Sequence, residues 1–233
     1  NLHYFNDLKA YDSKFRLDQQ TRILLDWVDK NPPGTSVAWD PYPTSLRIVN
    51  WIKWLYAGNS LPEKCLDSLT VQVRFLFNNL EWQILGNHIF SNAKALVFYG
   101  LAFNDPESEK FFNQGLNIIV EELPEQVLRD GGNFELSPMY HALFLEDILD
   151  LVNLAYCFPD AFSTKLIQKF EKNAIKMINW LKLMTHPDGE IAFFNDSAID
   201  IAANLKSLTA YAQKLNINIS SEIQNLTQIE YNY

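Results

Sequence analysis

An adjacent amide and imidazole, Asn87 and His88, follow Gly86 at a position where the sequence pattern predicts the start of a helix. The phenol of Tyr140 falls in the first turn of another predicted helix, after a serine–proline pair at 137–138 that is typical of a helix start. An amide can hydrogen-bond a carboxylate, and an imidazole or a phenol can transfer a proton. Each residue also has a simpler interpretation, because Asn87 could only cap its helix and His88 and Tyr140 could only pack against neighbours.

Acidic side chains in two loops offer a different chemistry, the paired carboxylates of a glycoside hydrolase. The candidates are Asp130, Glu135, Asp188 and Asp196. Acidic loops are common in a chain with 28 acidic and 19 basic residues, so solvated loops are the simpler interpretation. The His186 segment, HPDG, is typical of a turn. It is not expected to bind a metal, because no second ligand lies at a useful helical spacing.

Two aromatic residues and a cation lie in or just after a proline-rich loop, NPPGTSVAWDPYP, over residues 31–43. Trp39 and Tyr42 could stack on a sugar ring, or they could only cover the core. Arg47 could pair with a substrate carboxylate or with a structural acid. The spacing leaves these alternatives open.

Composition excludes several classes of protein. The chain has 233 residues, of which 48% are hydrophobic, and its net charge is −9. This charge argues against a nucleic-acid or anionic-membrane binder, and no apolar run approaches the roughly 20 residues that a membrane span requires. Cys65 and Cys157 stand 92 positions apart, which predicts two buried thiols and neither a disulfide scaffold nor a cysteine zinc site.

Helical periodicity dominates the chain, and its 8 glycines argue against a β-sandwich or barrel. The predicted fold class is all-α, built from antiparallel helical hairpins. Eight helices are predicted, over residues 17–29, 45–57, 62–80, 87–103, 106–128, 138–156, 163–184 and 199–215.

Helix order predicts where the unusual loops lie. If successive helices are antiparallel, four segments collect at one end of the domain, where a site is expected. These segments are the loop over residues 31–43, the Gly86–His88 junction, the loop over 130–140 (DGGNFELSPMY) and the turn over 186–197 (HPDGEIAFFNDS).

Several of these segments together resemble the heparinase II/III-like polysaccharide lyases. The resemblance runs from residue 1 to about 215 and is carried by NLHYF, WDPYPTSLRIVNWIKWL, GNHIFSNAKALVFYGLAF, DGGNFELSPMYH and HPDGEIAFFNDSA. It implies a partial α/α toroid over residues 1–215. Residues 216–233 would be a tail or linker toward a C-terminal β-sandwich, which is expected elsewhere in the full-length protein and not in this chain.

The resemblance also implies an activity, which is the cleavage of a uronate-containing polysaccharide by β-elimination. Asn87 would bind the substrate carboxylate, His88 would act as base or share in carboxylate binding, and Tyr140 would protonate the leaving O4. The expected substrate-binding residues are Trp39, Tyr42, Arg47, Glu135, His141 and Asn195.

The remaining expectations follow from the same resemblance. The expected partner is an acidic polysaccharide and the expected location is periplasmic or extracellular, although no signal peptide is visible. No cofactor is expected, and the residues themselves already argue against a metal site, a nucleic-acid partner and a membrane span. Two alternatives stay open. They are an inverting α/α-barrel glycoside hydrolase and a helical domain or inactive fragment that only binds glycans.

Overall fold

The computed structural model describes residues 2–219. The chain divides into two compact units, Asn1–Val120 and Glu121–Tyr233. A single toroid domain over residues 1–215 stays a prediction. The boundary falls within helix α5 (Ser108–Gln126). Of the predicted tail, residues 220–233 lie outside the described part of the chain.

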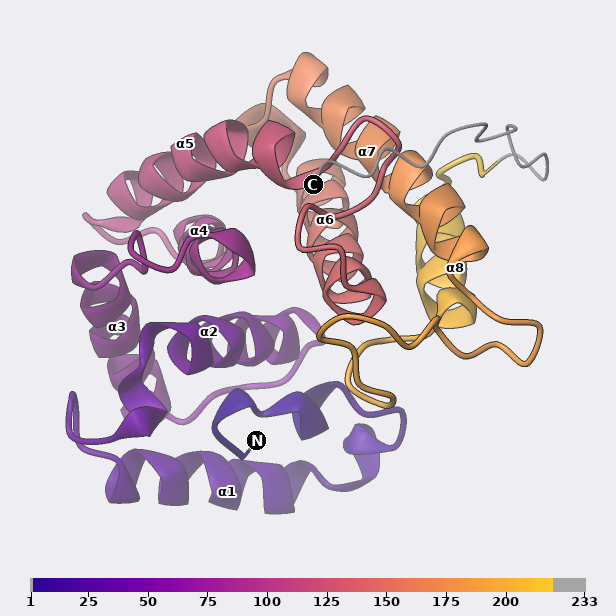
Figure 1. Ribbon diagram of the computed structural model, residues 1–233. Helices are drawn as coiled ribbons and strands as arrows, with labels where there is room; N and C mark the ends of the chain where they lie inside the picture. Colours follow the sequence, from indigo (N-terminus) through magenta and orange to yellow (C-terminus); the bar gives the residue numbers. More distant parts are fainter. Residues whose placement is uncertain (1, 220–233) are drawn as a thin grey trace. The chain divides into compact units, whose positions relative to one another are not determined.

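The first unit is built around helix α2 (Pro41–Tyr56), which contacts α3 (Glu63–Asn78) and α4 (Gly86–Ala102) (Figure 1). Helix α1 (Leu17–Lys30) packs against α3, and two short 3-10 turns near the N-terminus lie on α2. Helix α2 begins four residues earlier than predicted. Its first turn contains two prolines, whose missing N–H groups cost nothing at a helix start.

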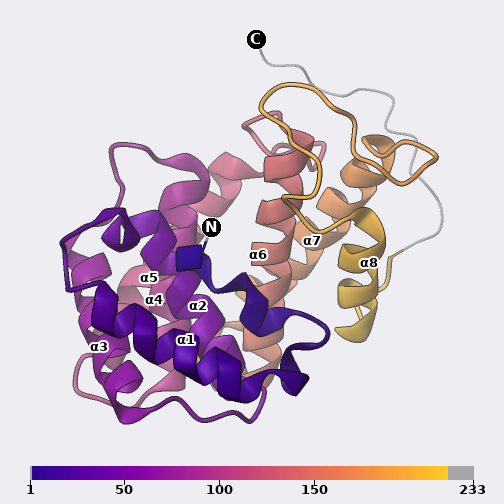
Figure 2. The same ribbon diagram turned by 90° about the horizontal axis from the view of Figure 1, so that it is seen from below.

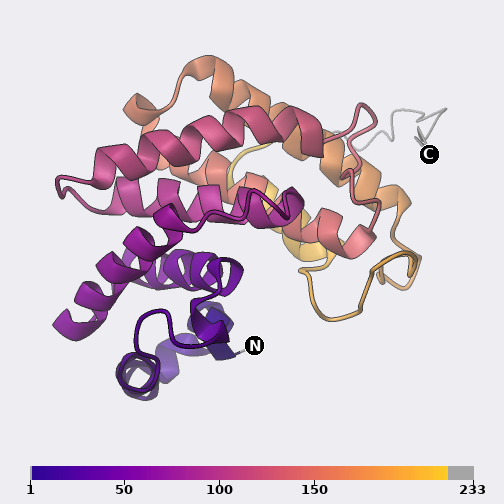
Figure 3. The ribbon, with the colours of Figure 1, turned by 60° about the vertical axis from the view of Figure 1, so that its left-hand side comes forward.

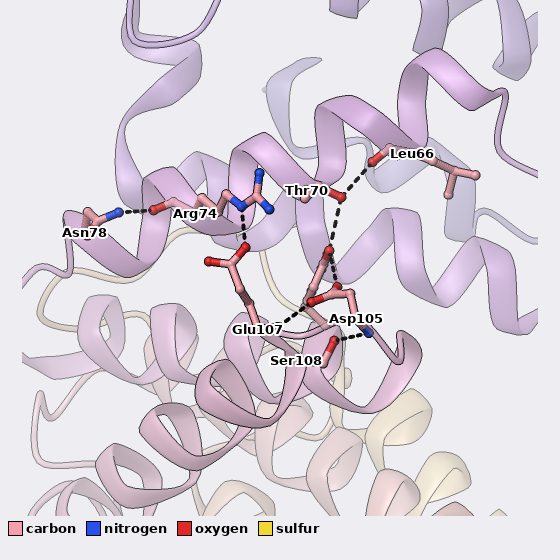
Figure 4. A network of polar contacts seen from close by, with 8 residues as sticks. Leu66, Thr70, Arg74, Asn78, Asp105, Glu107 and Ser108 are labelled. Carbon is pink, nitrogen blue, oxygen red and sulfur yellow. Dashed lines mark hydrogen bonds and ion pairs between the residues drawn. The ribbon is translucent and has the colours of Figure 1, made fainter.

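Helix α4 is buried on most of its faces, as expected for a helix that lies between neighbours. Its buried residues are Gly86 and every residue from Ile89 to Tyr99. At its C-terminal end, the Tyr99 hydroxyl donates to the Asp105 carboxylate at 2.9 Å and lies 3.1 Å from the Thr70 hydroxyl. Figure 4 shows the surrounding network, which joins α3 to the turn before α5 and includes an exposed ion pair between Arg74 and Glu107.

Helices α4 and α5 form a hairpin and run side by side over their first-unit residues (Figure 3). Two glycines permit the close approach. A Cβ added at Gly115 would lie 2.5 Å from the backbone oxygen of Ala93, and one at Gly100 would lie 2.6 Å from the Cβ of Phe112. Backbone atoms cannot move aside as the end of a side chain can, so this packing requires glycine at position 115.

We therefore expect Gly115→Ala to lower the free energy of unfolding by about 1–3 kcal/mol, the usual cost of overpacking a core. Denaturant unfolding followed by circular dichroism measures the change. Gly58→Ala is a control of a different kind, because nothing lies near the added Cβ there and only the positive φ of 88° opposes it. A Gly115→Ala protein as stable as the wild type would show that the hairpin can separate without cost.

The second unit contains α6 (Pro138–Cys157), α7 (Thr164–Leu183) and α8 (Leu205–Lys214), each in contact with the other two (Figure 2). Side-chain oxygens of Ser137, Ser163 and Asn204 cap their N-termini. The start of α8 is six residues later than predicted, because Asn204 supplies this cap and Asp200 adopts a positive φ of 63°.

The described residues contain no β-strand, only isolated bridges at Val127–Asn133 and Thr185–Ile191. Among the helices described, none is long and apolar enough to cross a membrane.

Both cysteines are free. Cys65 is buried as expected, whereas Cys157 is exposed, so the prediction of two buried thiols was wrong for Cys157.

Candidate active site

The first turn of α4 carries Asn87 and His88, both partly exposed. His88 Nδ1 lies 3.1 Å from Oε1 of Glu81, and the His88 ring stacks on Tyr42 with 4.5 Å between ring centroids. The imidazole is therefore held on one edge and on one face. We call Tyr42, Glu81, His88 and Asn92, with the neighbouring Asn87, the α4 cluster.

A sharp turn precedes this helix. Leu85 has a φ of 60° and Gly86 a φ of 58°, a backbone conformation that costs free energy at a leucine. The turn folds the chain back on itself, so that the N–H of Glu81 reaches Oδ1 of Asn92, in the second turn of α4, at 3.0 Å. Glu81 is thereby held beside the helix on which His88 lies.

A buried asparagine anchors Glu81. Asn92 donates from Nδ2 to Oε2 of Glu81 and to the hydroxyl oxygen of Ser45 in α2, both at 3.0 Å. The Asn92 side chain is fully buried and that of Glu81 is 6% exposed. Sequence reasoning missed both residues. No sequence signal marked them, because α4 also buries the polar residues Ser91 and Lys94.

Trp39 was expected at a sugar-binding surface, and the structure contradicts this. Its side chain is 2% exposed, and its Nε1 donates to the backbone oxygen of Asn31 at 3.0 Å. The ring packs against Trp27 and Phe75. Trp39 belongs to the core because its large apolar surface gains more from burial than from exposure to water. Tyr42, by contrast, remains partly exposed.

Arg47 was also expected to bind substrate, and the structure contradicts this because the side chain is fully buried. Its guanidinium donates to Gln72 Oε1 and to the Ala38 carbonyl oxygen, both at 2.8 Å, and lies 4.0 Å from the centroid of the Trp27 ring. Burial lowers the pKa of Arg47 to about 9, which still leaves it charged at neutral pH. Arg47 therefore ties the loop over residues 31–43 to α2 and α3.

A second set of contacts surrounds the first turn of α6, where Tyr140 is partly exposed. The Ser137 hydroxyl accepts from the Tyr140 N–H and lies 3.0 Å from the Ser197 hydroxyl. Asn195 Nδ2 donates to the backbone oxygen of Leu136 at 2.6 Å. We call Ser137, Tyr140, Asn195 and Ser197 the α6 cluster. It joins the loop over residues 130–140 to the turn over 186–197.

Glu135 and Asn195 lie at the surface of these two loops. Glu135 is partly exposed, and its backbone N–H donates to Oδ1 of Asn133 at 3.0 Å. Asn195 is exposed and adopts a positive φ of 51°, which asparagine tolerates better than most residues. Their assignment as substrate-binding residues stays a prediction.

His141 was also expected to bind substrate, and burial excludes it. Its Nδ1 accepts from the Asn133 N–H at 3.1 Å, its Nε2 lies 2.9 Å from the Met177 carbonyl oxygen, and its ring stacks on Trp180 at 4.4 Å. Burial lowers the pKa of His141 to about 4. His141 therefore positions the loop before Tyr140 against α7 as a neutral imidazole.

This burial gives a prediction about acid stability. In the unfolded chain His141 takes up a proton near its ordinary pKa of 6.5, whereas the folded protein resists protonation down to about 4. The unfolded state binds more protons between these values, so the free energy of unfolding falls as the pH falls, by roughly 3 kcal/mol in total. Denaturant titrations at pH 7 and pH 4.5 measure the loss.

His141→Gln is the matching variant, since an amide can also accept from the Asn133 N–H and donate to the Met177 oxygen without titrating. We expect its stability to change less between the two pH values than that of the wild type. His186→Gln, at an exposed histidine, is the control. An equal loss in the wild type and in His141→Gln would contradict this assignment.

Helix order predicted that four segments lie together at one end of the domain. The structure shows two contacts between these segments, one within each unit. The loop over residues 31–43 reaches the Gly86–His88 junction through the stacking of Tyr42 on His88. The loop over 130–140 meets the turn over 186–197 through Ser137 and Ser197. That all four share one end stays a prediction. No group of three side chains able to hold a metal is present among the described residues.

Comparison with known proteins places both clusters in a recognised family model, described as "Heparinase II/III N-terminus", which matches residues 9–221. A heparin-sulfate lyase of Bacteroides thetaiotaomicron is 28% identical over 212 residues, 81% of this chain and 30% of that protein. A heparin-sulfate lyase of Pedobacter heparinus is 28% identical over 193 residues, 75% of this chain and 28% of that protein. The chain thus spans less than a third of the length of these two relatives.

Solved structures agree on the fold. The crystal structure of heparinase III superposes with a TM-score of 0.71 at 22% identity, covering 93% of this chain and 36% of that one. The heparan sulfate lyase HepC from Pedobacter heparinus gives a TM-score of 0.61 at 22% identity, with 93% and 37% covered. These likenesses confirm the predicted fold class, an all-α arrangement of helical hairpins of the incomplete α/α-toroid type.

Proposed function

Because this chain belongs to the heparinase II/III family, we propose that it carries catalytic residues of a polysaccharide lyase that cleaves a uronate-containing polysaccharide by β-elimination. One observation carries the proposal. The matched range of the family model, residues 9–221, includes both clusters, and the α4 cluster contains a partly exposed imidazole held by a buried carboxylate.

The reaction makes three demands on the enzyme. The proton at C5 of a uronate is only weakly acidic, so its removal requires a base near C5. Negative charge develops on the neighbouring carboxylate, which requires a hydrogen-bond donor. As the C4–O4 bond breaks and the C4–C5 double bond forms, the departing O4 requires a proton.

Residues of the α4 cluster meet the first two demands in this proposal. Asn87 hydrogen-bonds the substrate carboxylate and stabilises the enolate-like intermediate. His88 takes the C5 proton or shares in carboxylate binding, depending on the configuration at C5. Tyr42, stacked on His88, contributes an aromatic surface for the sugar. A separate pocket in the first unit is lined by polar residues (Ser36, Asp40, Asn79 and Gln83) and by the aromatic residues Trp39 and Phe75, and by none of the α4-cluster residues.

The α6 cluster meets the third demand. Tyr140 donates its phenolic proton to O4, while Glu135 and Asn195 bind sugar hydroxyls on the same loops. The Ser137 cap and the contacts between Ser137 and Ser197 hold the first turn of α6, and thus the backbone of Tyr140, in place. No step assigned here uses a cofactor. The substrate class implies a periplasmic or extracellular site of action.

Two of the four candidate acidic residues, Asp130 and Asp188, give little support to the hydrolase alternative. Oδ1 of Asp130 accepts from the N–H of Gly132 at 2.8 Å, and Oδ1 of Asp188 accepts from the N–H of Glu190 at 2.9 Å. Both carboxylates therefore stabilise their own turns. Accepting a backbone hydrogen bond is a structural role. It explains why an acidic residue stands in each turn without requiring a catalytic function.

Incubation of the full-length protein with uronate-containing polysaccharides tests the proposal. We expect new ultraviolet absorbance from an unsaturated uronate in the product. New reducing ends without that absorbance would identify a hydrolase instead. Binding without turnover, unaltered by substitution of Tyr140, would identify a glycan-binding domain. A neutral polysaccharide that lacks uronate is the control substrate and should give no absorbance.

A further inference from the structure

The hydrogen bonds behind His88 define which of its nitrogens carries the proton. This series of hydrogen bonds begins at the backbone N–H of Glu81, which can only donate. The atom of Asn92 that faces it at 3.0 Å is therefore the side-chain oxygen. The Asn92 amide group therefore points its NH₂ at Oε2 of Glu81 and at Ser45. The orientation of the Asn92 side chain follows from the network itself.

The second carboxylate oxygen of Glu81 faces the histidine. Oε1 lies 3.1 Å from Nδ1 of His88, and an ionised carboxylate can only accept hydrogen bonds. Nδ1 must then carry the hydrogen, so in the neutral imidazole Nε2 carries the lone pair. Among the described residues, no hydrogen-bond partner faces Nε2, and the ring is 32% exposed.

We propose that Glu81, anchored by Asn92, is the positioning residue that holds His88 in the tautomer with a basic Nε2. This inference rests on the proposed function and deepens it. A lone pair on Nε2 suits a base that takes the C5 proton, whereas a carboxylate donor would require a hydrogen on Nε2. Of the two roles open to His88, the network selects the base.

Glu81→Gln tests this directly, because the new amide presents either its oxygen or its NH₂ group to His88. The NH₂ of Asn92 requires an oxygen opposite it, so the new Gln NH₂ turns toward Nδ1 of His88. Nδ1 then becomes an acceptor and the hydrogen moves to Nε2. We expect kcat for the lyase reaction to fall about 10²-fold, the lower end of what a general base supplies, with a much smaller change in KM.

The double variant Glu81→Gln/Asn92→Asp should reverse the effect. A carboxylate at position 92 still accepts from the backbone N–H at position 81, and it now also accepts from the Gln NH₂. The Gln oxygen then faces Nδ1 of His88 again, with the same net charge as in the wild type. We expect kcat to return to within about tenfold of the wild-type value. Glu107→Gln, which breaks an exposed ion pair, is the matched control and should leave kcat unchanged.

Nitrogen-15 chemical shifts of labelled histidine report the tautomer without any substrate. His88→Gln assigns the signal by its loss. We expect the hydrogen of the His88 ring to be on Nδ1 in the wild type and in the double variant. In Glu81→Gln we expect it to be on Nε2. The same tautomer in the wild type and in Glu81→Gln would overturn the inference, as would a folded double variant with no recovery of kcat.

This spectroscopic readout separates the two proposals. If the wild type forms no unsaturated uronate but the tautomer switches, the proposed lyase function fails and the role of Glu81 as positioning residue stands. If the lyase is active but Glu81→Gln keeps its tautomer and its kcat, the role of Glu81 fails and the lyase function stands. Thermal melts identify any variant that lost its fold, and the shifts of the remaining variants then decide.

Discussion

Tyr140→Phe is expected to lower kcat of the lyase reaction by roughly 10²–10⁴-fold, the usual contribution of a positioned proton donor. The substitution removes one hydroxyl group and keeps the ring, so the packing of the first turn of α6 should be preserved. The Ser137 cap uses the backbone N–H of residue 140, not its side chain, and is unaffected. Initial rates of ultraviolet absorbance measure the loss.

Tyr156→Phe provides a matched control. It removes the hydroxyl of a tyrosine on the same helix that donates to Glu171 at 2.6 Å, outside either cluster. We expect its kcat to match the wild type. A loss below tenfold for Tyr140→Phe in a folded, full-length protein would remove Tyr140 from the role of acid. Because O4 must still receive a proton, another donor would then have to be sought.

Asn87→Ala should cost about 10²–10³-fold in kcat, the range measured when one donor to a developing negative charge is removed. The amide is assigned to a charge that grows as the C5 proton leaves, so kcat should suffer more than KM. Steady-state kinetics at several substrate concentrations separates the two constants. Asn87→Asp should be at least as damaging, because it places a negative charge where a donor is required.

Stability measurements distinguish catalysis from folding at this position. Asn87 lies in the first turn of α4, where a lost helix-start contact costs about 1 kcal/mol. Such a change leaves a folded protein with reduced stability and an unaltered kcat. If Asn87→Ala lost activity only in proportion to its folded fraction, the asparagine would be structural.

The sequence alone was sufficient for much of the architecture. Apolar residues at helical spacing, with proline and glycine at the boundaries, predicted all eight α-helices that the described residues contain, but not the short 3-10 helices. Local chemistry decides these features, since capping and periodicity involve neighbours within a few positions. The same local chemistry placed Asn87 and Tyr140 correctly in first helical turns.

Burial was decided only by tertiary structure, and the sequence-based site was wrong where burial mattered. Trp39, Arg47 and His141 have side chains that could bind a sugar acid, yet each is enclosed by residues from elsewhere in the chain. Arg47, for example, meets Gln72 across 25 positions and His141 meets Met177 across 36. A linear pattern does not record which long-range partner satisfies a polar group.

The converse holds for Glu81 and Asn92. Neither residue type nor spacing distinguishes them from ordinary surface and core residues, because their importance lies in donor and acceptor directions that exist only after α2 and α4 have packed. The sequence by itself therefore determined the helices, the family and the principal candidate residues. Only the folded chain decided which side chains reach solvent and which groups face each nitrogen of His88. Both depend on atoms brought together from distant positions.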